Sequence, residues 1–150
     1  MPNNFTNMLI GEYIHSVDSK GRTSLPSKFK TMMGERVVLS RGFDKTLTVY
    51  TLEAWEKLNE KLSSLSISKE AERRFARFML SGAVEVEVDK QGRIRIPDFL
   101  RDYAEINDKK VVWTGVGDKA EIWSEKNWNT YIEETTKNPE KIAESLEGII

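Results

Sequence analysis

Residues 17–26, VDSKGRTSLP, recur 71 residues later at 88–97 as VDKQGRIRIP. Both copies hold an aspartate, a glycine and an arginine at the same spacing, and both end in proline. A repeat at a fixed period indicates that one structural unit is present twice. The fold class therefore follows from the architecture of this unit and from how its two copies pack.

The similarity extends beyond these two stretches. With a shift of about two residues, VLSRGFDKTLTVYTLEAW at 38–55 runs beside VVWTGVGDKAEIWSEKNW at 111–128. Each half predicts a strand, a tight loop, a strand, a proline, a short helical turn, two strands joined by a turn, and a helix. Thr51 and Ser124 are the expected N-caps of the two final helices.

The segment between the halves, ISKEAERRFARFML at 67–80, predicts a connecting helix with Ser68 as its cap and Gly82 as its stop. Its apolar residues at helical spacing are Ile67, Ala71, Phe75 and Phe78 or Met79. Its three arginines lie mostly off this stripe and are expected in solvent: Arg73, Arg74 and Arg77. The tail around Pro139 is polar, so we expect a loose end or a short packing helix.

The composition excludes several classes of site. The chain of 150 residues has no cysteine, one histidine and a net charge of −1. Disulfides, thiolate nucleophiles and cysteine-bound zinc are therefore excluded, and we expect no metal, no cofactor and no small-molecule substrate. His15 is interpreted as a strand residue that shares one face with Tyr13 and Val17. No segment has the ~18 apolar residues of a membrane helix, so we expect no membrane contact and a cytoplasmic location.

Each half is small, with about 65 residues, and buries only a modest core by itself. We expect each half to complete its sheet or barrel with the sister half or with another chain. Six aromatic residues outside the charged loops are expected in the core or between subunits: Trp55, Trp113, Trp123, Trp128, Phe75 and Phe78.

The repeated loops combine a turn with a basic side chain. In DSKG and DKQG, aspartate and glycine hold the first and fourth positions of a type I turn that closes a bulged hairpin. The next residue, Arg22 or Arg93, begins the return strand. Its guanidinium can pair with the aspartate four residues earlier, or it can reach a planar acceptor outside the protein.

Local charge favours an external partner. Residues 17–30 carry a net charge of +3 and residues 88–101 a net charge of +2, although the whole chain is slightly acidic. A turn needs aspartate and glycine but not the additional cations. Such patches suit phosphate oxygens, and an oriented arginine can contact a guanine edge in the major groove. Binding of another anion or of a protein, and a purely structural role, remain as alternatives.

GEYIHSVDSKGRTSLPSKFK at 11–30, EVDKQGRIRIPDFLRDYA at 87–104 and the chain length resemble the MraZ family of bacterial transcriptional regulators. The resemblance implies an α+β, mainly β fold: two tandem SpoVT/AbrB-like swapped-hairpin β-barrel domains with short helices, assembling into a ring. The expected boundaries are 10–57 for the first domain, 58–80 for the connecting helical segment, 81–132 for the second domain and 133–150 for the tail.

The resemblance also implies a function. It implies a repressor, associated with the nucleoid, that binds short direct repeats of double-stranded DNA upstream of the division and cell-wall operon that includes its own gene. The implied DNA contacts are Arg22, Arg93, Lys20, Lys90 and Arg95. The implied loop-positioning residues are Asp18, Gly21, Asp89 and Gly92.

Two other classes of function are retained. An antitoxin-like interaction module would use the basic loops to bind an acidic protein. A hydrolase would use Asp18 and Asp89 as catalytic carboxylates. The neighbouring cations are expected to lower the pKa of both aspartates, which suits a general acid poorly, so we expect no enzyme.

Overall fold

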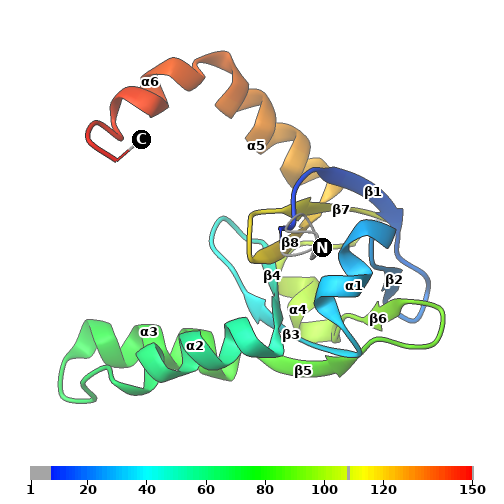
Figure 1. The fold of residues 1–150 in the computed structure, drawn as a ribbon, viewed down its shortest axis with the longest axis horizontal. Helices are drawn as coiled ribbons and strands as arrows, with labels where there is room; N and C mark the ends of the chain where they lie inside the picture. The colour runs from blue at the N-terminus through cyan, green and yellow to red at the C-terminus, as the bar shows by residue number, and fades with distance from the viewer. Residues whose placement is uncertain (1–7, 108, 150) are drawn as a thin grey trace, which may run out of the picture.

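The computed structural model describes residues 8–107 and 109–149, and its elements occur in two similar series (Figure 1). The first series is β1 (Glu12–Ser16), β2 (Arg22–Ser24), the 3-10 turn η2 (Ser27–Phe29), α1 (Lys30–Met33), β3 (Arg36–Arg41), β4 (Leu47–Thr51) and α2 (Leu52–Ser63). The second, after α3 (Glu70–Ser81), is β5 (Val84–Glu87), β6 (Arg93–Arg95), α4 (Asp98–Tyr103), β7 (Lys110–Gly115), β8 (Lys119–Ser124) and α5 (Glu125–Lys137). The chain ends with α6 (Pro139–Glu144). The order of elements expected for each half is confirmed.

The two halves share one antiparallel sheet. Its strand order is β1-β7-β8-β4-β3-β5, so the first strand of each half pairs with a strand of the other half. The strands β4 and β8 join the halves at the centre. Each half therefore completes its sheet with its sister half, which is one of the two arrangements expected from their size.

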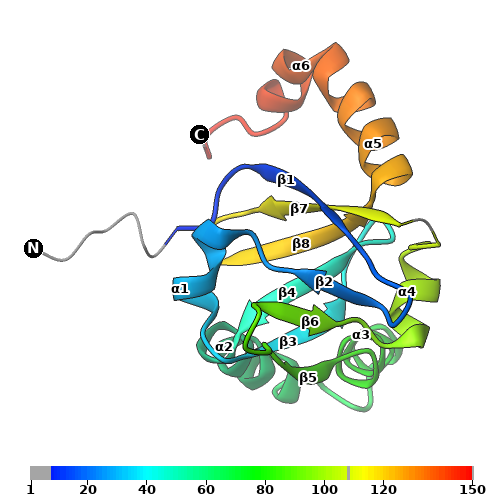
Figure 2. The same cartoon turned by 90° about the vertical axis from the view of Figure 1, so that its right-hand side faces the viewer.

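A second, two-stranded ribbon of β2 and β6 crosses between the halves (Figure 2). Thr23 pairs with Ile94 at its centre, Arg22 with Arg95, and Ser24 with Arg93. Thr23 and Ile94 are themselves equivalent under the 71-residue repeat. The ribbon thus has a local pseudo-two-fold axis, and the two repeated loops lie at its opposite ends.

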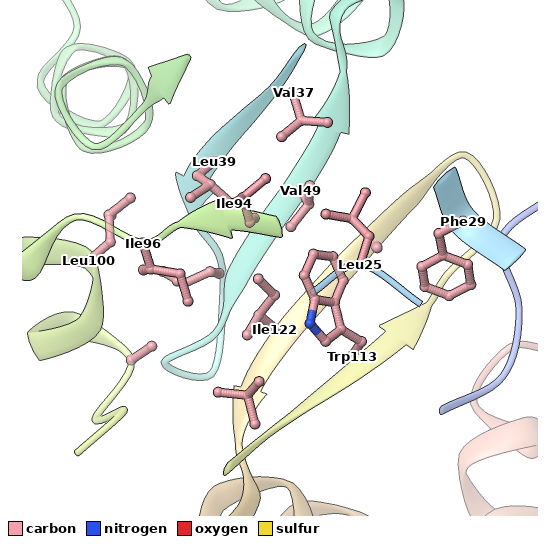
Figure 3. Close-up of a cluster of buried hydrophobic side chains, with 14 of the residues drawn as sticks. Leu25, Phe29, Val37, Leu39, Val49, Ile94, Ile96, Leu100, Trp113 and Ile122 are labelled. Atoms are coloured by element: carbon pink, nitrogen blue, oxygen red, sulfur yellow. The ribbon is translucent and has the colours of Figure 1, made fainter. Parts of the chain in front are cut away.

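The core lies between the ribbon and the large sheet (Figure 3). Thr23 and Ile94 are buried at the ribbon's centre, and the indole Nε1 of Trp113 lies 3.4 Å from Thr23 Oγ1. Trp113 is 0% exposed. Further core residues come from η2, from α4, from the strands and from the connections that follow β2 and β6: Leu25, Phe29, Val37, Leu39, Val49, Ile96, Leu100 and Ile122. The inner face of the ribbon is therefore fixed by apolar burial.

The other aromatic residues pack between helices and strands. Trp55 of α2 contacts Tyr50, with ring centroids 5.3 Å apart. Trp128 of α5 lies in the same way on Trp123 of β8, at 5.2 Å. These contacts confirm the packing role expected for the tryptophans, because both pairs cover parts of the sheet away from the charged loops.

Two of the three N-caps predicted from the sequence are present. Thr51 and Ser124 accept hydrogen bonds from Ala54 N and Asn127 N, which confirms both expected N-caps. The expected cap Ser68 is wrong: α3 begins after Lys69, and the Ser68 hydroxyl pairs with that of Ser66. Ser68 is not free to cap, because the chain stays in a turn until Lys69.

The apolar stripe expected along α3 is only partly covered. Met79 is buried and Phe78 is half-buried, whereas Ile67 is 78% exposed and Phe75 is also exposed. Arg74 and Arg77 lie in solvent as expected, and Arg73 is half-buried. The C-terminal end of α3 packs on β3, where Arg41 Nη1 donates to Phe78 O. The apolar residues nearer the N-terminal end of the helix remain exposed.

The C-terminal helices extend away from the sheet (Figure 1). The helix α5 contacts β7 and β8 and continues to Lys137. The helix α6 begins at Pro139, with Asn138 as its N-cap. This tail is helical as far as residue 144, and residue 150 lies outside the described residues. No helix in the described part of the chain is long and apolar enough to cross a membrane.

Candidate nucleic-acid interface

The first loop, residues 18–22, is the predicted bulged turn. The Gly21 N–H donates to Asp18 O at 3.0 Å, and the Asp18 N–H donates to Arg22 O at 2.9 Å. Gly21 has φ of 80°, a left-handed conformation that glycine adopts without strain. The side chain of Asp18 then accepts the backbone N–H groups of Lys20 and Arg22, both at 2.9 Å. Asp18 therefore fixes the backbone of the loop, as expected.

The second loop, residues 89–93, repeats this geometry bond for bond. The Gly92 N–H donates to Asp89 O, and Gly92 has φ of 77°. Asp89 accepts the backbone N–H groups of Gln91 and Arg93, again at 2.9 Å. The two loops differ in sequence at two inner positions, so the shared turn geometry does not depend on the side chains at those positions.

Each arginine of the motif is hydrogen-bonded to the protein through only one edge of its guanidinium group. Arg22 Nε donates to Asp18 Oδ2 at 2.7 Å, and Arg93 Nε donates to Asp89 Oδ2 at 2.9 Å. Among the described residues, the terminal Nη groups of these two arginines have no protein acceptor. Their side chains are 33% and 28% exposed. Each guanidinium is thus oriented by its aspartate while its outer edge stays available for an acceptor.

The same contacts keep the aspartates ionised. Hydrogen bonding from the Arg22 backbone N–H is the main cause that lowers the pKa of Asp18 from 3.8 to about 2. The Arg93 backbone N–H has the same effect on Asp89, whose pKa lies below its usual value of 3.8. Both carboxylates are therefore charged at neutral pH and act as fixed acceptors.

The outer face of the ribbon is basic. Alternation along β2 and β6 puts Thr23 and Ile94 in the core, so Arg22, Arg93 and Arg95 lie on the opposite, solvent side. Arg95 stands where the first half has Ser24. Its Nε donates to Lys20 O at 3.1 Å, which ties β6 to the first loop. Three arginines from both halves are thereby brought to one narrow surface.

The two loop lysines flank this face. Lys20 and Lys90 are both exposed, but they occupy different positions of their loops, since Gln91 is the counterpart of Lys20. The structure therefore brings together the expected arginines and places one lysine at each end of the ribbon.

His15 has a structural role. It lies half-buried on β1 beside the buried Val17, and its Nδ1 is 2.5 Å from Ser24 O. This contact joins β1 to the ribbon and confirms the interpretation of His15 as a strand residue. Within residues 8–107 and 109–149, no cluster of three or more His, Asp or Glu side chains could hold a metal ion.

Sequence reasoning missed two residues beside the loops, Lys30 and Arg101. A Cβ atom added to Gly21 would lie 2.8 Å from Arg101 Cζ, and one added to Gly92 would lie 2.5 Å from Lys30 Cε. Each cation thus packs against the loop of the other half. The available signal was their equivalence under the 71-residue repeat, which keeps a cation at this position in both copies.

The fold and this surface define a class: a tandem-repeat α+β protein in which two halves share a sheet and present a basic β-ribbon. A family model described as "MraZ protein, putative antitoxin-like" matches the chain twice, at residues 8–78 and 79–147. The chain belongs to the MraZ family.

Curated relatives match over almost their whole length. The chain is 49% identical over 141 residues to "Transcriptional regulator MraZ" of Caldanaerobacter subterraneus subsp. tengcongensis, covering 94% of this chain and 98% of the relative. It is 46% identical to the proteins of the same name from Thermoanaerobacter sp. (strain X514) and Halothermothrix orenii, with 95% of this chain and 99% of each relative covered. The family to which the chain belongs is thus one of proteins named transcriptional regulators.

Proposed function

We propose that this chain is a sequence-specific DNA-binding transcriptional regulator and that the ribbon β2–β6 with its two loops is its reading surface. The observation that carries the proposal is the repeated loop geometry, in which aspartate holds Arg22 or Arg93 by Nε and leaves the Nη edge free. A guanidinium oriented in this way suits a bidentate contact to guanine O6 and N7.

The shape of the surface supports a major-groove contact. A two-stranded β-ribbon fits the major groove of B-form DNA, and several known regulators read DNA with such a ribbon. The outer face holds Arg22, Arg93 and Arg95, and Lys20 and Lys90 lie at the ends. Arg22 and Arg93, which the loop aspartates orient, are suited to base edges, and Arg95 and the flanking lysines to phosphate oxygens.

We further infer that the protein acts as a homo-oligomeric ring. One chain neutralises few phosphates, whereas a ring with many loops would bind repeated sites through a high effective concentration. Exposed apolar residues at both ends of the molecule support association: Ile67, Phe75 and Leu80 at α3, and Tyr131, Ile142, Leu146 and Ile149 at the C-terminus. The net charges are of opposite sign: α3 carries three arginines and two glutamates, whereas α5 and α6 together carry five glutamates and three lysines.

The resemblance extends the proposal to the target. We infer a nucleoid-associated repressor of the division and cell-wall operon, including its own gene, that reads short direct repeats. We also infer SpoVT/AbrB-like domains at 10–57 and 81–132, a helical connector at 58–80 and a tail at 133–150. The exchange of β1 and β5 between the halves supports a swapped-hairpin arrangement.

A gel-shift titration with DNA from the region upstream of the protein's own gene tests the proposal. The double variant Arg22→Ala/Arg93→Ala is expected to lose the shift and to keep the wild-type elution volume on a sizing column. Lys57→Ala is the matched control, because Lys57 is exposed on α2, away from the ribbon, and pairs only with Glu53 among the described residues. An unchanged shift by the double variant would refute the assignment of the loops.

The antitoxin-like module remains the second candidate, because the family description itself carries that term. A groove of about 450 Å³ along α3 and the loop that precedes it, lined by Leu65, Ile67 and Leu80 among others, offers a surface for a protein partner. Copurification of a stoichiometric acidic partner, without any DNA shift, would favour this function.

The hydrolase is disfavoured by the state of its carboxylates. Asp18 and Asp89 already accept several hydrogen bonds, and these bonds hold the pKa of each below the ordinary value. A general acid needs a pKa near the working pH. Loss of a turnover on Asp89→Asn with unchanged DNA binding would be needed to restore this candidate.

A further inference from the structure

Two cations outside the Asp–Arg motif hold equivalent places in the two halves. Lys30 is the first residue of α1, and Arg101, 71 residues later, lies in α4. The first loop lies near α4 and the second loop on the side of α1 (Figure 2). Each helix therefore belongs to one half and stands beside the loop of the other.

Each cation packs against the glycine of the opposite loop. Around Gly21, a Cβ atom would lie 2.8 Å from Arg101 Cζ and 2.9 Å from its Nε. Around Gly92, a Cβ atom would lie 2.5 Å from Lys30 Cε and 2.6 Å from its Nζ. These distances are shorter than real side chains tolerate, so each cation occupies the space that the missing side chain leaves.

The carbonyl groups of the same two glycines accept hydrogen bonds from the other half of the chain. Ile96 N donates to Gly21 O at 2.8 Å, and Leu25 N donates to Gly92 O at 2.9 Å. Each glycine peptide is thus bonded by the opposite strand and covered by the opposite cation. The arginine that follows each glycine, Arg22 or Arg93, starts from a backbone that the sister half has fixed.

The guanidinium group of Arg101 is only partly hydrogen-bonded. Its Nη2 pairs with Asp98, and its side chain is only 23% exposed. Its Nε is buried and has no acceptor among the described residues. A buried donor without an acceptor costs free energy and is rare in folded proteins. The packing of the guanidinium on Gly21 therefore persists despite that cost.

We propose that Lys30 and Arg101 are positioning residues for DNA reading, each holding the Asp–Arg loop of the opposite half in the orientation that presents Arg22 and Arg93. The inference rests on the proposed function, and it adds that neither loop is oriented by its own half alone. Loss of such a contact is expected to lower sequence specificity rather than sequence-independent affinity for DNA. A misplaced guanidinium loses its contact with a base but can still bind a phosphate.

A binding titration on two duplexes separates positioning from simple phosphate contact. The duplexes are the protein's own upstream DNA and a scrambled duplex of equal length, each measured at two salt concentrations. Arg101→Met is expected to weaken binding to the upstream duplex about tenfold, the size of one base contact, and to leave the scrambled duplex nearly unchanged. Lys30→Met is expected to give the same selective loss through the second loop.

Rescue provides the conservative control. Arg101→Lys installs the residue that the first half already uses at Lys30, and it is expected to restore most of the affinity for the upstream duplex. Lys28→Met removes an exposed cation two residues from Lys30. It is expected to weaken both duplexes equally, as a phosphate contact does.

The outcomes are distinct. The positioning proposal is overturned if both methionine variants retain wild-type preference for the upstream duplex, or lose both duplexes to the same degree. If Arg101→Met fails to fold, as judged by its thermal unfolding, Lys30→Met on the exposed α1 decides alone. If the wild-type protein itself does not prefer the upstream duplex, the proposed function fails instead.

Discussion

At the scale of single residues, Asp18 and Asp89 show how one side chain performs two tasks. Each carboxylate closes the loop through backbone N–H groups and orients an arginine through Nε. Because charged hydrogen bonds are stronger than neutral ones, this arrangement favours the ionised form. The arginine is thus pre-oriented before any partner binds.

This ionisation predicts a pH dependence of stability. The pKa of Asp18 is about 2 in the folded chain and 3.8 in the reference state. A depressed pKa contributes stability that is complete above about pH 4 and is lost as the pH falls toward 2. Asp18→Asn removes the titrating group, so its melting temperature should vary less with pH between 4 and 2 than that of the wild type. Thermal unfolding across this range checks the prediction, and equal slopes for the two proteins would contradict it.

At the scale of elements, the ribbon β2–β6 divides its residues between two tasks. Its inner residues, Thr23 and Ile94, anchor it to the core, and its outer residues carry the arginines. Stability and binding are therefore open to separate tests, one on each face.

The inner face predicts a loss of stability without a change of charge. Ile94 is 1% exposed at the centre of the ribbon. Ile94→Ala should lower the free energy of unfolding by about 2–5 kcal/mol, because it removes buried methyl groups and leaves a cavity. Urea denaturation at a fixed protein concentration measures this value. Ile14→Ala, on the exposed side of β1, should stay within about 0.5 kcal/mol of the wild type, and a similar loss in both variants would contradict the account of the core.

The outer face predicts a change in salt dependence. Arg95→Ser gives the second strand the residue that the first strand has at Ser24. If Arg95 neutralises one phosphate, the slope of log affinity against log salt should become shallower by about 0.9. The titration is made at several salt concentrations with the upstream duplex. A slope identical to that of the wild type would show that Arg95 does not neutralise a phosphate.

Comparison of the helices, strands and turns with the sequence shows which features could be predicted. The turns and the caps at Thr51 and Ser124 were predictable, since their hydrogen bonds join residues at most four apart. The cap predicted at Ser68 was wrong because the turn before α3 continues to Lys69. The exchange of β1 and β5, and the packing of Arg101 on Gly21, join residues of different halves, and no local pattern encodes such pairs. The repeat signalled only that both halves keep a cation there.

At the scale of the whole molecule, the pseudo-two-fold ribbon and the two exposed apolar ends have different consequences. The ribbon carries one loop at each end, whereas α3 and the C-terminus expose apolar residues that the described part of the chain does not cover. A ring would cover the ends and align many ribbons along repeated DNA sites.

The ring predicts that assembly and tight binding fail together. Ile142→Asp/Leu146→Asp puts two charges among the exposed apolar residues of the tail. The variant should elute as a smaller species with an unchanged circular dichroism spectrum. Its affinity for a duplex with several repeats should fall to that for a single repeat, because the effective concentration is lost. Ala143→Asp, next to Ile142 on α6, is the control. An intact oligomer in the double variant would exclude Ile142 and Leu146 from the ring contact.

The central claim is that the Asp–Arg loops read base edges in the major groove. Dimethyl sulfate protection of the upstream duplex tests it most directly, because the reagent methylates guanine N7 in the major groove and adenine N3 in the minor groove. We expect wild-type protein to protect guanine N7 within the repeats, and the Arg22→Ala/Arg93→Ala variant, at the concentration at which the wild type saturates the DNA, to leave those guanines reactive. Protection that is confined to adenine N3, or that persists in the variant, would contradict the account.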